Sequence, residues 1–218
     1  MALRFGLLAA FMALSIFCAA GTAYYWQGWA YLADFCGSSL RLTVYLFRHD
    51  RALLERRLRA GPLAEKTIAQ RTIMVFASAG FIALLIVPAL DYRLGWSRVS
   101  PLVEICGLAL VAIGFYVVYV VYRVNTFSAA TIQVEPGQTV ISTGPYALVR
   151  HPMYVGSQLM FLGTPLALGS YWGLLVFVAM MPVFIWRQLD EERFLAKNLP
   201  GYADYQRKVR WRLIPGLF

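Results

Sequence analysis

The sequence predicts an all-α integral membrane protein, a polytopic helical bundle of about six transmembrane helices arranged in three hairpins. Two observations support this fold class. The chain has 218 residues, of which 60% are hydrophobic and only 14% are charged, whereas about a quarter of the residues of a soluble globular domain are charged. The apolar residues also form uncharged runs of about 20 residues, the length that a helix needs to cross a bilayer.

The predicted spans follow one another with short connections. They cover about residues 5–25, 29–47, 72–90 and 101–122, and two short helices within 152–186 that are separated at Gly169-Ser170. The first run continues without a small-residue cleavage site, so we interpret it as a retained helix and not as a signal peptide. Each half of the 152–186 run is short for a membrane span, so we expect these helices to extend past Pro152 and Trp186.

The positions of the basic residues predict the orientation. Of the 20 lysines and arginines, seven lie between Arg48 and Arg71 and seven between Arg187 and Arg212. Lysine and arginine collect in cytoplasmic loops, so we expect both clusters and both termini on the cytoplasmic side. A five-span alternative would put one cluster outside. The net charge of +9 is thus interpreted as an orientation signal and a contact to membrane lipids, and no nucleic-acid partner is expected.

Two ionisable residues fall inside the second predicted span. Asp34 and Arg41 are seven residues apart and share a helix face, but they are separated by about 10 Å along the axis, too far for a direct pair. A charge at membrane depth is costly and points to function. Two interpretations stay open: each residue meets a polar partner on another helix, or Arg41 borders a ligand cavity.

The C-terminal third contains two polar clusters that a membrane hairpin would bring to one face. The first is Arg150-His151-Pro152-Met153-Tyr154-Val155-Gly156, and the second contains Arg187, Glu191 and Glu192. Pro152 suits the first position of a helix, so His151 and the N–H groups of that turn would offer a site for a polar ligand. The alternative is a helix that leaves the membrane with Arg187 and Glu191 as an i,i+4 charge pair. No nucleotide-binding glycine motif and no metal-ligand spacing occurs in the sequence.

These motifs resemble the signature of a known family. Gly144-Pro145-Tyr146, the run from Arg150 to Gly156 and the second cluster are similar to the isoprenylcysteine carboxyl methyltransferases, whose wider group includes phospholipid N-methyltransferases. The resemblance covers about residues 125 to 215, and its second part comprises Arg187, Glu191-Glu192, Leu195, Gly201-Tyr202, Tyr205 and Arg212-Leu213-Ile214-Pro215.

The resemblance implies a membrane methyltransferase that binds S-adenosylmethionine at the cytosolic side. In that family, the position of Glu191 binds the cofactor and the position of Arg187 contacts the substrate, so we take Arg187 as the catalytic and substrate-binding residue. The remaining positions that match cofactor contacts are Gln133, Gln138, Thr139, Val140, Ile141, Tyr146, His151, Pro152, Met153 and Tyr154. Residues 1–124 would form transmembrane hairpins with a basic cytoplasmic loop, and residues 125–218 the catalytic region with the last hairpin and a cytoplasmic tail.

We therefore expect methyl transfer to a lipophilic or prenylated acceptor that enters from the bilayer, with a prenylcysteine-like carboxylate as the first candidate. A carboxylate is already nucleophilic and would be oriented by Arg187, so the enzyme would contribute mainly positioning and desolvation. Other interpretations stay open: transfer to a lipid amine or a small thiol, a non-catalytic membrane protein that retains the fold, and a reductase, because some sterol reductases share the architecture of the C-terminal bundle.

Overall fold

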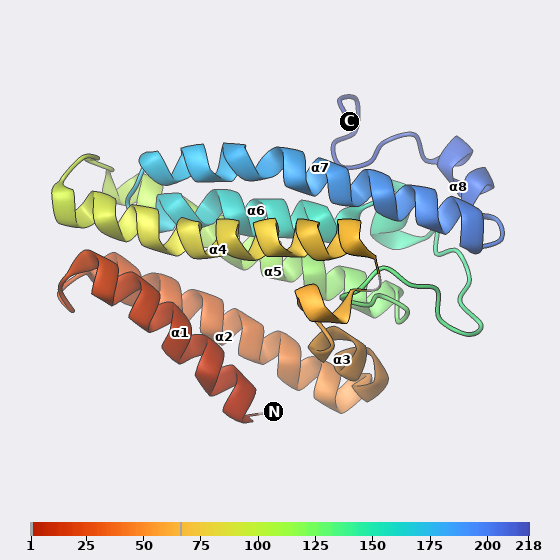
Figure 1. Cartoon of the computed structure of the whole chain (residues 1–218), viewed down its shortest axis with the longest axis horizontal. Coiled ribbons are helices and arrows are strands. Elements are labelled where there is room, and N and C mark those ends of the chain that lie inside the picture. Colours follow the sequence, from red (N-terminus) through yellow and green to blue (C-terminus); the bar gives the residue numbers. More distant parts are fainter. Residues whose placement is uncertain (1, 66) are drawn as a thin grey trace. The chain divides into compact units, whose positions relative to one another are not determined.

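A computed structural model describes residues 2–65 and 67–218 of the chain. Every regular element among these residues is helical, so the all-α prediction is confirmed. Figure 1 labels the α-helices. The elements are α1 (Ala2–Ala20), α2 (Trp26–His49), α3 (Arg51–Leu58), η1 (Pro62–Ala64), α4 (Ile68–Leu94), α5 (Pro101–Val124), η2 (Gly144–Ala147), α6 (Pro152–Ala167), α7 (Trp172–Asn198) and α8 (Tyr202–Lys208). Lys66, which belongs to the first basic cluster, lies outside the described residues.

Four helices of the described chain are long and apolar enough to cross a membrane: α1, α4, α5 and α7. They correspond to four of the six predicted spans. The other two helices fall short for different reasons. Helix α2 has 24 residues but includes Asp34, Arg41 and Arg48, whereas α6 has only 16 residues, below the roughly 17 to 25 of a transmembrane helix. That α2 and α6 also span the membrane therefore stays a prediction.

The ends of α6 and α7 decide whether the predicted extensions exist. Helix α7 continues past Trp186 to Asn198, as predicted. Helix α6 begins at Pro152, so the extension predicted before this residue is wrong. The backbone N–H of His151 donates to the carbonyl of Arg212 at 2.9 Å and therefore pairs with the C-terminal segment. Pro152 itself has no N–H and is well suited to the first helical position.

The described chain forms two compact units, and each is assembled from three separate segments. The first contains the described residues of Met1–Arg41 together with Ser78–Phe115 and Gln158–Met181, and the second contains Leu42–Ala77, Tyr116–Ser157 and Pro182–Phe218. Several helices thus contribute one part to each unit. The functional boundary predicted at residue 124 concerns activity and stays a prediction.

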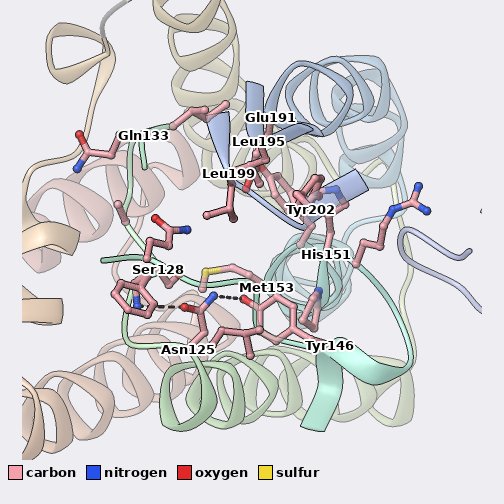
Figure 2. Close-up of a pocket in the computed structure, with 18 of the residues that line it drawn as sticks. Asn125, Ser128, Gln133, Tyr146, His151, Met153, Glu191, Leu195, Leu199 and Tyr202 are labelled. Carbon is pink, nitrogen blue, oxygen red and sulfur yellow. Dashed lines mark hydrogen bonds between the residues drawn. The ribbon is translucent and has the colours of Figure 1, made fainter. Parts of the chain in front are cut away.

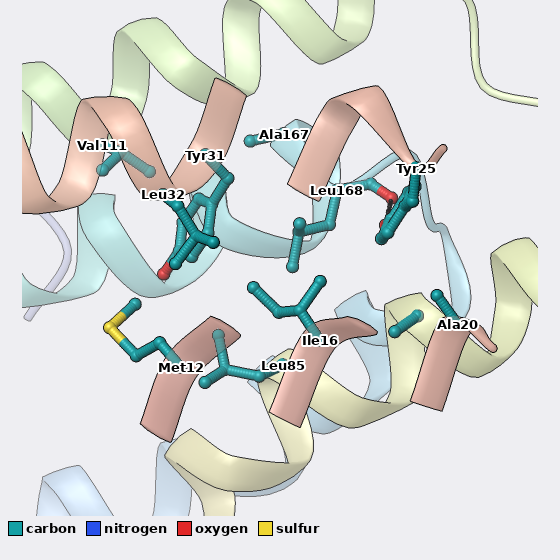
Figure 3. Packing of buried hydrophobic residues seen from close by; sticks show 11 residues of the cluster. Met12, Ile16, Ala20, Tyr25, Tyr31, Leu32, Leu85, Val111, Ala167 and Leu168 are labelled. Atoms are coloured by element: carbon teal, nitrogen blue, oxygen red, sulfur yellow. Dashed lines mark hydrogen bonds between the residues drawn. The ribbon is translucent and has the colours of Figure 1, made fainter. Parts of the chain in front are cut away.

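The first unit has a hydrophobic core that contains two buried tyrosines, and the hydroxyl of each has its own hydrogen-bond partner. Met12 and Ile16 of α1 pack there with buried residues of α2, α4, α5 and α6 (Figure 3). The hydroxyl of Tyr31 lies 3.1 Å from that of Thr164, and the hydroxyl of Tyr25 donates to the carbonyl of Leu168. Buried hydroxyl groups are costly without such partners, so these contacts allow aromatic residues to fill the core.

Within the first unit, α5 and α6 approach so closely that only glycine fits. A Cβ atom at Gly107 would lie 2.2 Å from the backbone nitrogen of Ala167, and one at Gly163 would lie 2.6 Å from the carbonyl oxygen of Gly107. Small residues at helix interfaces in membranes allow such backbone contact. A side chain at either position would force the two helices apart.

The second unit has a smaller core formed by the C-terminal residues of the chain. Leu199, Tyr202, Tyr205 and Val209 pack together. Partly buried residues from α7 and from the connection between α5 and α6 cover this cluster: Val134, Val140, Tyr146 and Leu195. The cluster fixes the connection 125–151 against α8, although that connection has little regular structure of its own.

Candidate functional site

The second unit contains a cavity of about 250 Å³. Figure 2 shows Gln133, Tyr146, His151, Met153 and Glu191 around it. The structure brings every residue that the sequence predicted for the site to the wall of this one cavity, namely Gln133, Gln138, Thr139, Val140, Ile141, Tyr146, His151, Pro152, Met153, Tyr154, Arg187 and Glu191. Their individual roles stay predictions. Arg41 is not among the residues that line this cavity, so the interpretation that it borders a ligand cavity stays a prediction.

Glu191 supplies the only carboxylate among the described residues that line the cavity. Its Oε2 accepts a hydrogen bond from the hydroxyl of Tyr154 at 2.8 Å. Among the described side chains, no lysine, arginine or histidine lies within 4.0 Å of this carboxylate. A carboxylate in a cavity wall with only a neutral donor is suited to a positively charged group of a ligand.

The neighbouring Glu192 has a different environment, which the sequence did not reveal. It is buried, and its Oε1 accepts from Arg150 Nε at 2.7 Å and lies 3.0 Å from His151 Nε2. Its Oε2 accepts from Arg212 Nε at 3.0 Å. Glu192 thus ties α7 to the start of α6 and to the C-terminal segment. Successive residues on a helix point about 100° apart, so only one glutamate of the pair lines the cavity.

His151 is held more tightly than its position in the sequence suggested. Its ring contacts Glu192, its backbone N–H donates to Arg212, and the residue is only 4% exposed. The predicted free backbone donor at this position is therefore wrong, because the C-terminal segment already uses it. The His151 side chain still forms part of the cavity wall.

Arg187 lines the cavity, but its charge is balanced by a residue distant in sequence. Its Nη2 donates to Glu65 Oε1 at 2.8 Å and to the carbonyl of Ala130 at 3.0 Å. Its Nη1 donates to Gln70 Oε1 at 2.5 Å. The i,i+4 ion pair with Glu191 is therefore wrong. Glu65 is only 2% exposed, so this is a buried pair in which each charge requires the other.

Aromatic residues form another part of the wall, and Asn125 orients one of them. Asn125 Nδ2 donates to the hydroxyl of Tyr146 at 2.8 Å, and Asn125 Oδ1 accepts from the N–H of Phe127 at 3.0 Å (Figure 2). The hydroxyl of Tyr205 donates to the carbonyl of Tyr146 at 2.8 Å. Burial raises the pKa of Tyr146 to about 12, so its phenol stays neutral near physiological pH. No sequence motif pointed to Asn125.

The segment 126–130 of the wall is fastened by arginines that donate to its carbonyl groups. Arg56 donates to Thr126, Arg57 donates to Ala129 at 2.7 Å, and Arg187 donates to Ala130. Arg57 itself lines the cavity, with its guanidinium 5.4 Å from the ring centroid of Tyr122. From the sequence, Arg56 and Arg57 were assigned, as members of the first basic cluster, only to membrane orientation and lipid contact.

One family and three individual proteins are similar to parts of this chain. Residues 102–200 match the phospholipid methyltransferase family. A cobalt-zinc-cadmium resistance protein of Cupriavidus metallidurans is 36% identical over 86 residues, which are 37% of this chain and 38% of that protein. Protein-S-isoprenylcysteine O-methyltransferase of Schizosaccharomyces pombe is 36% identical over 72 residues, 32% of this chain and 30% of the relative. Delta(14)-sterol reductase of Mus musculus is 30% identical over 94 residues, 40% of this chain and 22% of the relative.

The alignments thus cover between 22% and 38% of the relatives' own lengths. The family match includes the cavity residues Tyr146, His151, Arg187 and Glu191, but it begins after Arg57 and Glu65. The four apolar helices described above agree with a multi-pass membrane protein. Through residues 102–200, the chain is similar to the group of membrane methyltransferases that contains the phospholipid and isoprenylcysteine enzymes, the group that its sequence motifs resemble.

Proposed function

We propose that the protein is a membrane-embedded methyltransferase that uses S-adenosylmethionine and acts on a lipophilic acceptor, with a prenylcysteine-like carboxylate as the first candidate. The observation that carries the proposal is the cavity of the second unit. It gathers the motif residues of a methyltransferase group around Glu191, a carboxylate with no described cation within 4.0 Å. The proposal includes six spans, with both termini and the cavity on the cytoplasmic side.

The chemistry of the wall fits the functional groups of this cofactor. Glu191 can accept hydrogen bonds from an ammonium group. The neutral ring of Tyr146 can stack on an adenine or face a cation, and the side-chain amides of Gln133 and Gln138 offer donors and acceptors. When bound, the cofactor supplies a methyl group that is already activated on a sulfonium.

The side chains of the wall would act by positioning and by excluding water. Tyr154 holds Glu191 through its hydroxyl, and the apolar residues Met153, Leu195 and Leu199 limit access of water. With a carboxylate acceptor, an O–CH₃ bond forms as the S–CH₃ bond breaks, and no proton has to be removed. This agrees with a wall whose single histidine, His151, is already engaged with Glu192.

One observation favours a second candidate, a lipid amine as the acceptor. The charge of Arg187 is balanced by Glu65, so an anionic acceptor at Arg187 would compete with a resident carboxylate. A neutral headgroup would avoid this competition. The amine would have to lose its proton before or during transfer, so this candidate needs a proton acceptor that the carboxylate reaction does not.

The test uses purified protein in lipid nanodiscs and labelled S-adenosylmethionine. Calorimetry first measures cofactor binding, and transfer is then compared for a prenylcysteine analogue, phosphatidylethanolamine and a small thiol, with products identified by mass. Labelled carboxyl ester supports the first candidate, and N-methylated lipid supports the second. Binding of a nicotinamide cofactor in place of S-adenosylmethionine would indicate a reductase, and binding of neither would leave a non-catalytic protein.

Replacing Arg187 by lysine should preserve cofactor binding and reduce methyl transfer by at least about tenfold, equivalent to about 1.4 kcal/mol. A single ammonium cannot reproduce the planar guanidinium that meets Glu65, Gln70 and Ala130 together. Calorimetry and initial rates measure the two quantities. Equal losses in affinity and rate would contradict a role in the acceptor site. An equal loss for anionic and neutral acceptors would limit Arg187 to holding Glu65.

The proposed topology predicts that Gly61 faces the cytoplasm and Gly95 the outside. Each is replaced by cysteine in a variant that lacks the native cysteines, and intact cells are treated with an impermeant thiol reagent. The cysteine at position 95 should react and the one at 61 should react only after permeabilisation, because the basic cluster around residue 61 is retained inside. Labelling of position 61 in intact cells would overturn the orientation.

A further inference from the structure

The three arginines that line the cavity differ in how their charges are balanced. Arg150 pairs with Glu192, and Arg187 pairs with Glu65; in both pairs, the acidic partner is buried. Arg57 has no carboxylate within 4.0 Å among the described residues. Its contacts are neutral: the carbonyl of Ala129 and the ring of Tyr122. The charge of Arg57 is therefore available to a ligand in the cavity.

The wall also contains one negative charge that matches the charge of Arg57. Glu191 is the carboxylate of the wall, and it has no described cation within 4.0 Å, although its charge also acts on Arg187, which pairs with Glu65. The cavity thus presents one positive and one negative charge that have no ion-pair partner among the described residues. The charges of Glu191 and Arg57 both act on the phenol of Tyr146. Burial is the largest influence on the pKa of Tyr146 and raises it; the charge of Glu191 raises this pKa further, and that of Arg57 lowers it. The two charges therefore lie near one phenol.

We propose that Arg57 binds the α-carboxylate of the amino-acid tail of S-adenosylmethionine, while Glu191 binds the ammonium group on the same carbon. This assignment rests on the proposed function. It adds a cofactor-binding residue on α3, outside the part of the chain that matches the methyltransferase family. Arg57 then has two tasks, because the same side chain holds Ala129 in the cavity wall.

The pair of charges favours the cofactor over an anionic acceptor as the partner of Arg57. An amino-acid tail carries both charges on one carbon and therefore uses both Arg57 and Glu191. An anionic headgroup would use only Arg57 and would be repelled by Glu191, because like charges in a poorly solvated wall are unfavourable. A zwitterion is the ligand whose charges complement this wall.

The test compares S-adenosylmethionine with its decarboxylated analogue, which keeps the ammonium, sulfonium and adenosine groups. Calorimetry on the full chain in nanodiscs should show the wild-type protein binding the analogue about tenfold more weakly or worse, the effect of losing one charge-assisted hydrogen bond. Arg57→Gln should weaken binding of S-adenosylmethionine by a similar factor and change binding of the analogue by less than about twofold.

Arg56→Gln is the matched control. Arg56 precedes Arg57 on α3 and donates to the carbonyl of Thr126 in the same loop, but it does not line the cavity. This variant removes the same charge and should leave the ratio of the two affinities as in the wild type. A changed ratio would mean that basic charge on α3 acts at long range, which would overturn the assignment to Arg57.

The outcomes separate this assignment from the proposed function. No binding of S-adenosylmethionine to wild type refutes the proposed function. Wild-type binding that Arg57→Gln leaves intact, or weakens equally for both ligands, refutes only the role of Arg57. If Arg57→Gln only slows transfer to anionic acceptors, that result also refutes the role of Arg57 in cofactor binding. If Arg57→Gln does not fold, the comparison of the two ligands on wild type and on Arg57→Lys still decides, because equal affinities would refute the assignment.

Discussion

Replacing Glu192 by alanine should destabilise the protein by about 3 to 5 kcal/mol, the usual cost of removing one partner from a buried ion pair. The substitution leaves Arg150 and His151 without their carboxylate in a region where each is less than a tenth exposed. The loss of the carboxylate is less costly for Arg212, because 30% of its side chain is exposed to water. Thermal unfolding in detergent, followed by circular dichroism and by tryptophan fluorescence, measures the loss.

Asp204→Ala is the control for this substitution. Asp204 also pairs with an arginine, Arg207, but both side chains are largely exposed. Exposed pairs contribute little, at most about 1 kcal/mol. The two variants therefore remove the same kind of interaction from buried and exposed surroundings. Similar unfolding midpoints for the two variants would show that the contacts around Glu192 do not hold the segments together.

Replacing Glu191 by glutamine should reduce affinity for S-adenosylmethionine by about 10- to 100-fold and leave the fold intact. A hydrogen bond to a charged group contributes about 1.5 to 3 kcal/mol, and the amide no longer carries the charge that an ammonium group requires. The fold is expected to survive because the amide oxygen can still accept from the hydroxyl of Tyr154, the partner of Glu191 in the structure. Calorimetry measures the affinity, and unfolding is recorded on the same samples.

The contrast between the two glutamates is the sharpest part of this prediction. Glu191→Gln should alter binding without altering stability, and Glu192→Ala should alter stability first. His151→Ala is expected to fall between them: its ring lines the cavity, but it also contacts Glu192. Because His151 matches a cofactor-contacting position of the family, we expect this variant to bind the cofactor more weakly while it stays folded. A variant with wild-type affinity at position 151 or 191 would remove that residue from the site.

The position of the cavity could be predicted from sequence because its main residues belong to local motifs. The run from His151 to Tyr154 and the position of Glu191 were assigned because they match short motifs of a known family, and such motifs consist of near neighbours in the chain. Residue type and spacing alone could not distinguish Glu191 from Glu192, because the two have the same chemistry and only the rotation of α7 decides which one meets the cavity. That rotation depends on packing between segments distant in sequence. The resemblance to the methyltransferase family selected Glu191.

The partners of the arginines were out of reach for a related reason. Glu65 is separated from Arg187 by 122 residues, and no spacing rule connects them. The local rule favoured Glu191, one turn along the same helix, but that pairing stabilises an isolated helix by only a few tenths of a kcal/mol. The buried carboxylate of Glu65, with two further acceptors near Arg187, stabilises the arginine more than that pairing would. Arg57 was missed because a basic cluster near a membrane is explained equally well by orientation.

The way in which the arginines hold segment 126–130 has an evolutionary consequence. Arg56, Arg57 and Arg187 bind main-chain carbonyl groups, which every residue type provides. The side chains of this segment, among them Phe127, Ser128 and Ala129 in the cavity wall, are therefore free to change while the backbone keeps its course. Mutations there could change which methyl acceptor binds without disrupting the backbone of the segment. Related chains are therefore expected to diverge in this segment while keeping the arginines that anchor it.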